Sequence, residues 1–211
     1  MSLIDISRSV SPATAVWPGD QEVEWAWTRR LEQDGASVNL GSIRLSTHTG
    51  THVDAPYHVH DDGKKTEDLP LGAFIGTAQV VDVGSASSVR PEHAQRFAGP
   101  AAPRVLFRTS ASTLSSDEWP GSVAPISPET VRFLSEAGTV LVGTDAPSVD
   151  PLDSTGLPAH HALLEAEIVH LEGLSLANVP AGQYELIALP LKIPGSDASP
   201  VRAVLRKAPA Q

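Results

Sequence analysis

Residues 48–58 read His48-Thr-Gly-Thr-His52-Val-Asp54-Ala-Pro56-Tyr-His58, so this short segment carries several side chains of the types that bind metal ions. Positions 48, 52, 54 and 58 have the same parity, and on an extended chain their side chains would point to one face. The Thr-Gly-Thr stretch disfavours a helix. Pro56 would end the strand and turn His58 back toward the others. The segment therefore predicts a strand with a cluster of histidine and aspartate side chains.

The ligand types in this cluster favour a borderline divalent metal. Imidazole and carboxylate groups suit zinc, manganese, cobalt or iron better than calcium or magnesium, which prefer oxygen ligands alone. The chain contains no cysteine, so disulfides, thiolate zinc sites and cysteine nucleophiles are excluded. Gly50 fits a close backbone approach or a bend beside the site. A single histidine near a strand is usually structural, but three histidines and an aspartate at one parity indicate a metal site.

A catalytic metal site needs further protein ligands beside its solvent position. The segment 159–173 (AHHALLEAEIVHLEG) offers His160, His161, Glu165, Glu167, His170 and Glu172. Most of these are expected on a solvated helix. Glu172 differs because it follows an apolar run and precedes Gly173, where a strand end commonly presents a side chain. Surface or structural positions are expected for His60, His93 and His170, and Asp145 is expected to end a buried strand with a structural hydrogen bond.

Short runs rich in β-branched residues recur between turn signals and predict strands over 38–46, 77–83, 105–109, 139–143 and 184–191. Helices are few. Ser127 is a predicted N-cap before Pro128 and opens a helix over 129–137. A second helix is expected from near Pro158 to about Glu167, and a third over 90–97. The pattern predicts one α/β domain over residues 1–211, with a strand-rich mixed sheet and few helices.

The composition disfavours several classes of protein. A net charge of −10 lacks the basic surface that a nucleic-acid partner requires. Hydrophobic residues make up 41% of the chain, which allows a sizeable core. The segment MSLIDISRSV lacks the features of a secretory signal, and no apolar run reaches the roughly 20 residues that span a bilayer. We therefore expect a cytoplasmic protein with neither a nucleic-acid nor a membrane partner.

The motif His-x-Gly-Thr-His-x-Asp-x-Pro-x-His at 48–58 resembles the signature of the cyclase family of metal hydrolases. The similarity continues through the segments 5–7, 16–20, 69–76, 143–150, 184–192 and 197–204. The Trp-Pro-Gly-Asp segment at 17–20 and the compact length favour the formamidase branch of that family. This resemblance implies a swivelling β/β/α fold, a homodimer, and hydrolysis of a small molecule, N-formyl-L-kynurenine, to L-kynurenine and formate.

The resemblance also implies a site with two zinc ions, although manganese or another divalent metal would suit the same ligands. The implied metal ligands are His48, His52, Asp54, His160 and Glu172. The first three would bind one ion, while Asp54 and Glu172 would contact both. The adjacent His161 leaves an ambiguity of one residue, but the spacing to Glu172 favours His160.

His58 would be the proton donor and acceptor of the implied reaction, and Trp17 would contact the substrate. The segment from Asp197 to Arg202 is expected to help bind the charged end of that substrate. Another hydrolase of the same family, acting on a cyclic amide such as isatin, stays an alternative. A non-catalytic metal-binding protein is disfavoured because its ligand set would not need His58. A serine hydrolase is disfavoured because no Gly-x-Ser-x-Gly motif occurs.

Overall fold

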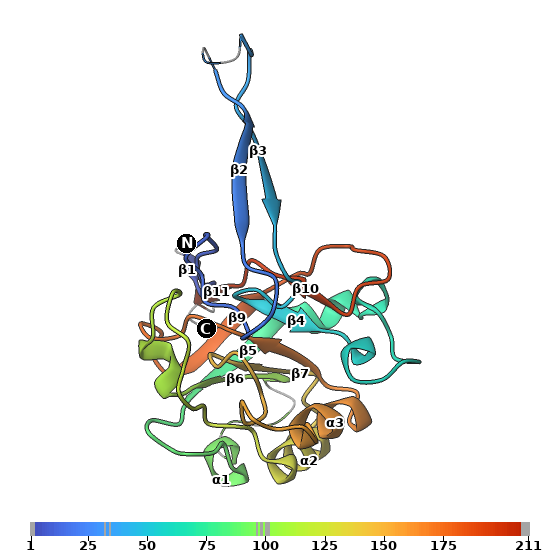
Figure 1. Ribbon diagram of the computed structural model, residues 1–211. Coiled ribbons are helices and arrows are strands. Elements are labelled where there is room, and N and C mark those ends of the chain that lie inside the picture. The colour runs from blue at the N-terminus through green and yellow to red at the C-terminus, as the bar shows by residue number, and fades with distance from the viewer. Residues whose placement is uncertain are drawn as a thin grey trace.

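A mixed sheet of nine strands forms the centre of the molecule (Figure 1), in a computed structural model that describes residues 3–207 except 32, 34, 96, 98, 100 and 101. Its strands are β1 (Leu3–Asp5), β4 (His52–Asp54), β5 (Ile75–Asp82), β6 (Arg104–Arg108), β7 (Leu141–Thr144), β8 (Val169–Glu172), β9 (Gly182–Ile187), β10 (Ala198–Pro200) and β11 (Val204–Lys207). They follow the order β1-β11-β9-β5-β6-β7-β8-β4-β10. Strands β5 to β8 pair in parallel, and the remaining pairs are antiparallel.

The two faces of the sheet bury separate hydrophobic clusters. Side chains of β6 alternate between them, with Leu106 in one cluster and Val105 and Phe107 in the other, as the period of two along a strand requires. The second cluster is covered by α2 (Pro128–Glu136) and α3 (Pro158–Glu165), which lie with α1 (Pro91–Ala94) on one side of the sheet (Figure 1). Each fully buried side chain of this kind contributes about 1.5–3 kcal/mol.

Short 3-10 helices occupy several connections, at η1 (Pro56–His58), η2 (Thr66–Asp68), η3 (Leu71–Phe74) and η4 (Ser110–Thr113). A separate hairpin of β2 (Glu24–Arg29) and β3 (Leu40–Arg44) projects from the body on the side away from the helices (Figure 1). No described helix is long and apolar enough to cross a membrane.

The predicted class, an α/β fold with a strand-rich mixed sheet and few helices, is confirmed. The strands predicted over 77–83, 105–109 and 139–143 correspond to β5, β6 and β7. The strand predicted over 184–191 ends earlier, at Ile187, and Pro190 forms only an isolated bridge. The strand predicted over 38–46 is β3, which pairs only with β2 and stays outside the main sheet.

The helix predicted after Ser127 is confirmed as α2, and the Ser127 hydroxyl accepts a hydrogen bond from the Thr130 amide at 3.2 Å. The helix predicted from Pro158 is α3, which ends two residues short of the predicted Glu167. Glu167 has φ +53, outside the helical region. In the region 90–97 the described residues form only the short α1, and residue 96 lies outside the described residues.

A close backbone contact joins the start of β4 to the end of β8. Gly173 has φ +63, and a Cβ added there would lie 2.1 Å from the Gly50 carbonyl oxygen. The Thr51 hydroxyl donates to the Gly173 carbonyl at 2.6 Å. The close backbone approach expected at Gly50 is therefore confirmed, and its partner is Gly173.

We expect Gly173→Ala to lower the free energy of unfolding by about 1–3 kcal/mol, because alanine is strained at positive φ and its Cβ would overlap the Gly50 carbonyl. Thermal unfolding followed by circular dichroism in the presence of a chelator measures this loss. Gly156→Ala is the matched control, since a Cβ at Gly156 meets no atom within 4 Å. Equal melting temperatures of the two variants would contradict the account of this contact.

Candidate metal centre

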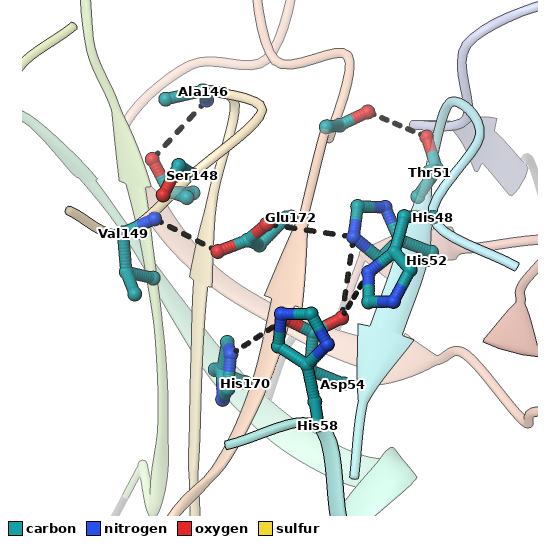
Figure 2. Close-up of polar contacts among 12 residues, drawn as sticks. His48, Thr51, His52, Asp54, His58, Ala146, Ser148, Val149, His170 and Glu172 are labelled. Atoms are coloured by element: carbon teal, nitrogen blue, oxygen red, sulfur yellow. Dashed lines mark hydrogen bonds and ion pairs between the residues drawn. The ribbon is translucent and has the colours of Figure 1, made fainter. Parts of the chain in front are cut away.

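Strands β4 and β8 bring ligand-type side chains together as cross-strand pairs. His52 lies opposite Glu172, and Asp54 lies opposite His170. Directly opposed residues of an antiparallel pair place their side chains on the same face. All four side chains are buried and point toward one another (Figure 2).

Three further histidines reach this cluster from other elements. His48 lies in the turn before Gly50, His58 ends η1, and His160 is buried on the first turn of α3. The extended segment expected before Pro56 is a strand only over residues 52–54, and His48 lies in the turn that precedes it. The predicted turn at Pro56 is confirmed, since Pro56 begins the 3-10 helix that returns His58 to the cluster.

One group of atoms can hold a first metal ion. Asp54 Oδ1 lies 3.0 Å from His48 Nδ1 and 3.3 Å from His52 Nε2. His52 Nε2 is also 3.4 Å from Glu172 Oε2. Ligand atoms of a tetrahedral zinc ion, at ordinary bond lengths, lie about 3.4 Å apart. The spacing of this group therefore fits a shared ion.

A second group uses the other oxygens of the same two carboxylates. His160 Nε2 lies 3.5 Å from Asp54 Oδ2 and 3.6 Å from Glu172 Oε1. His170 Nε2 lies 3.2 Å from Asp54 Oδ2. Asp54 and Glu172 thus direct one oxygen toward each group, which is the arrangement that two neighbouring ions require.

Unsatisfied buried atoms at this centre support a metal. Among the described residues, His52 Nε2 and Asp54 Oδ1 are both buried and make no hydrogen bond of good geometry, although they lie 3.3 Å from each other. An unsatisfied buried polar group costs about 1–3 kcal/mol, and more when it is charged. A divalent cation between these two atoms would remove that cost, so the residues fit the metal that the sequence motif predicts.

In His52 and His160, the ring nitrogen that points away from the carboxylates of the centre contacts a hydrogen-bond acceptor. His52 Nδ1 lies 3.1 Å from the Gly50 carbonyl oxygen, and His160 Nδ1 lies 2.7 Å from Asp150 Oδ2. Histidines that ligate metals almost always have such an acceptor on the other nitrogen, because it fixes the tautomer and the orientation of the ring. Asp150 also accepts hydrogen bonds from the Ala159 and His160 amides at the start of α3.

The charges of the cluster shift its pKa values strongly. Burial lowers the pKa of His52, but the Asp54 and Glu172 carboxylates outweigh burial and raise it to about 10. Burial likewise lowers the pKa of His160, while Asp150, Asp54 and Glu172 raise it to about 10. Burial raises the pKa of Asp54, but the surrounding imidazoles hold it well below its usual value. Without a metal ion, the His52 and His160 imidazoles are therefore protonated at neutral pH, and their charge balances that of the carboxylates.

His58 behaves differently from these histidines. Burial lowers its pKa, and the His48 and His160 imidazoles add to this effect against the attraction of Asp54. Its side chain is 32% exposed. The lowered pKa favours the neutral form of the His58 imidazole, and the side chain has access to solvent.

A cavity of about 350 Å³ opens onto the centre. His48, His52, Asp54, His58, His160 and Glu172 all line it. Trp17 and Trp119 form part of its wall, with ring centroids 5.3 Å apart at an interplanar angle of 82°. The structure thus brings Trp17 to the same cavity as the metal-binding side chains. Trp119 was missed from the sequence because no spacing links it to the motif.

The remaining residues singled out in the sequence lie either at the centre or away from it. His160 is buried at the centre and His161 is exposed, so of the two only His160 lies with the other ligand-type side chains. The structural role expected for Asp145 is confirmed, since its carboxylate accepts hydrogen bonds from the Thr109 amide and hydroxyl, both at 2.6 Å.

Of the surface or structural positions expected for His170, the structure shows a buried one, in which its ring contacts the Asp54 carboxylate. His60 is exposed, and His93 accepts a hydrogen bond from the Arg90 amide. Arg202 pairs with Asp5, with its Nε 3.0 Å from Asp5 Oδ1, and the substrate-binding role expected for the segment from Asp197 to Arg202 stays a prediction.

Known proteins are similar to this chain over nearly its whole length. Residues 4–151 match the family model described as "Putative cyclase". A kynurenine formamidase from Salinibacter ruber (strain DSM 13855 / M31) is 69% identical over 210 residues, which cover 99% of each chain. The solved structure of a potential metal-dependent hydrolase with cyclase activity has a TM-score of 0.82 at 27% identity, covering 97% of this chain and 96% of that one.

Isatin hydrolase A from Ralstonia solanacearum also has a TM-score of 0.82, at 22% identity, covering 97% of this chain and 91% of its own. This second structural likeness concerns the fold alone. The cyclase-like fold implied by the sequence motif is confirmed by these structures.

Metal binding at neutral pH should release protons, because His52 and His160 have pKa values of about 10 without metal and must be neutral to ligate an ion. The affinity for zinc should therefore rise with pH toward about pH 10. Calorimetric titration of metal-free protein in two buffers of different ionisation enthalpy measures the release, which we expect to reach about one proton per ion. A binding enthalpy independent of the buffer would contradict this assignment.

Proposed function

The chain belongs to the cyclase family of metal-dependent hydrolases, and on this premise we propose that it hydrolyses N-formyl-L-kynurenine to L-kynurenine and formate. The observation that carries the proposal is an imidazole, that of His58, on the same cavity as two carboxylates that each face two groups of candidate metal ligands. The 69% identity to a kynurenine formamidase supports the choice of substrate. Residues 1–211 act as a single hydrolase domain.

The proposed metal is zinc, with two ions in each chain, and manganese or another divalent metal would suit the same ligands. The ligands of the first ion are His48, His52 and Asp54. His160 would hold the second ion, and Asp54 and Glu172 would contribute to both sites. Bound divalent ions would lower the pKa of water toward about 7 and polarise the formyl carbonyl.

His58 moves the proton of the reaction. Its imidazole nitrogen accepts a proton from the attacking water, which forms a bond to the formyl carbon. When the bond between that carbon and the arylamine nitrogen breaks, His58 returns the proton to the nitrogen. A lowered pKa supports this role because the imidazole is neutral before the reaction. Proton transfer of this kind typically contributes about 10²–10⁴ in rate.

Trp17 contacts the aromatic ring of the substrate, and Trp119 holds Trp17 by an edge-on contact. The two tryptophans wall the cavity that opens on the centre. Aromatic pairs prefer edge-on or offset geometry and contribute about 0.5–1.5 kcal/mol beyond their buried area. A preformed aromatic wall supports an arylamide substrate over an aliphatic one.

The proposed oligomer is a homodimer in which the hairpin of β2 and β3 contacts a second copy of the chain. An isolated hairpin is marginally stable in water, and this one exposes large apolar side chains. Trp25 is 49% exposed, Trp27 48%, Leu40 54% and Ile43 52%. Burial of these side chains against a second copy would stabilise the hairpin.

The experiment that tests the activity measures hydrolysis of N-formyl-L-kynurenine by purified protein before and after chelation, with metal counted per chain. We expect turnover that chelation abolishes and zinc restores, at about two ions per chain. Isatin is the comparison substrate. Turnover of isatin alone by the metal-loaded protein would move the chain to another branch of the family, and no metal with no turnover would contradict the proposal.

Substitutions at His58 and His52 should separate proton transfer from metal binding. We expect His58→Ala to keep its metal and lose about 10²–10⁴ in kcat, whereas His52→Ala loses metal as well as activity. Elemental analysis and steady-state kinetics measure both properties. His161→Ala is the control because this neighbour of His160 is exposed. Equal metal content and equal activity in the His58 and His52 variants would refute this division of roles.

Replacing both hairpin tryptophans should dissociate the dimer. Tryptophan is enriched among the few interface residues whose truncation costs about 2 kcal/mol or more, so Trp25→Ser with Trp27→Ser should shift the mass measured by light scattering from two chains to one. Leu71→Ser is the control, because Leu71 is 61% exposed and lies outside the hairpin. An unchanged mass in the double variant would place the interface elsewhere.

A further inference from the structure

The backbone places Asp197 beside the metal centre although it lies far from the motif in sequence. Strand β10 pairs antiparallel with β4, with Ala198 opposite Asp54. The Ala55 amide donates to the Asp197 carbonyl at 2.8 Å, which extends this pairing by one step. Asp197 is therefore held next to the segment that joins Asp54 to His58.

The Asp197 side chain lies between two histidines of the site. Its Oδ2 is 3.0 Å from His48 Nε2 and 3.7 Å from His58 Nδ1. The Thr47 hydroxyl donates to its Oδ1 at 3.1 Å, which limits rotation of the carboxylate. The His48 and His58 rings are themselves close, with centroids 4.3 Å apart.

His48 is thus held between two carboxylates of different function. Its Nδ1 faces Asp54 Oδ1, one of the proposed metal-ligating oxygens, at 3.0 Å. A carboxylate acceptor at Nε2 keeps the proton on that nitrogen, so Nδ1 keeps its lone pair for a metal ion. This is the same relation that the Gly50 carbonyl has to His52 and Asp150 has to His160.

We propose that Asp197 is a positioning residue shared by His48 and His58, which orients the first as a metal ligand and keeps the second beside the metal centre. The part that concerns His58 rests on the proposed function, whereas the part that concerns His48 requires only that the centre binds metal. Asp197 does not contact substrate in this proposal, because the described residues that line the tryptophan-walled cavity include His48 and His58 but not Asp197.

The proposal predicts a specific pattern of metal loss. Removal of an outer partner of a ligating histidine typically weakens metal affinity by about 10–100-fold. We therefore expect Asp197→Ala to weaken binding of one of the two zinc ions by that factor and to leave the other unchanged. Asp197→Asn, which keeps the size of the side chain and one acceptor oxygen, should retain more affinity than Asp197→Ala.

Competition with a chromophoric chelator measures the zinc affinity, and the visible spectrum of the cobalt-loaded protein reports the geometry around the ions. The spectrum of Asp197→Ala should differ from that of the unsubstituted protein. Asp61→Ala is the charge-matched control, because Asp61 is exposed on a loop and its removal changes the net charge equally. Unchanged zinc affinity and an unchanged cobalt spectrum in both Asp197 variants would overturn the proposal.

Kinetics at saturating zinc test the part that concerns His58. We expect the kcat of Asp197→Ala to stay at least about tenfold below that of the unsubstituted protein, with KM unchanged, because the loss concerns a group that acts only in the transition state. Recovery of full kcat at saturating zinc would overturn the link to His58. If the protein does not hydrolyse N-formyl-L-kynurenine at all, the proposed function fails, while the zinc affinity still decides the role of Asp197 toward His48.

Discussion

The structure depends on the charge compensation of two carboxylates, Asp54 and Glu172, that are buried on neighbouring strands. Moving a carboxylate out of water costs several kcal/mol unless a cation or hydrogen bonds compensate it. Here the two side chains are 2% and 3% exposed and lie among imidazoles, whose pKa values they raise. Either protons on these imidazoles or divalent cations can supply the missing charge. The same compensation explains why the centre is both a structural and a chemical unit.

The rest of the fold serves to keep this cluster in register. The pairing of β4 with β8 places the carboxylates opposite histidines, and the hydrogen bond from the Thr51 hydroxyl to the Gly173 carbonyl joins the two segments at that end. Helix α3 is tied to the centre at its first turn, where Asp150 accepts the backbone amides and also contacts the His160 ring. Strand β10 completes the centre from the other side. A rigid centre is needed because metal ligation and proton transfer both fail at small errors of position.

Local signals in the sequence predicted much of this arrangement. The β-branched runs gave the positions of β5, β6 and β7, and Ser127 followed by Pro128 marked the start of α2, because these features depend on neighbours along the chain. The ligand types at 48, 52 and 54 were recognisable for the same reason.

The position of His170 at the centre was missed. His170 and Glu172 lie on the same face of β8, but that face meets Asp54 only because β8 pairs with β4, which lies more than one hundred residues earlier in the chain. Asp150 and Trp119 were missed because they reach the site through tertiary contacts. The hairpin strand β2 was missed because Trp25 and Trp27 are exposed in this chain and form no part of the main sheet.

We propose that each of two metal ions would receive one oxygen from Asp54 and one from Glu172. Anomalous diffraction from crystals of the zinc-loaded protein, collected on both sides of the zinc absorption edge, tests it most directly. We expect two peaks about 3.5–4 Å apart, one against His48 and His52 and the other against His160, with both carboxylates between them. A single peak, or two peaks that share neither carboxylate, would contradict it.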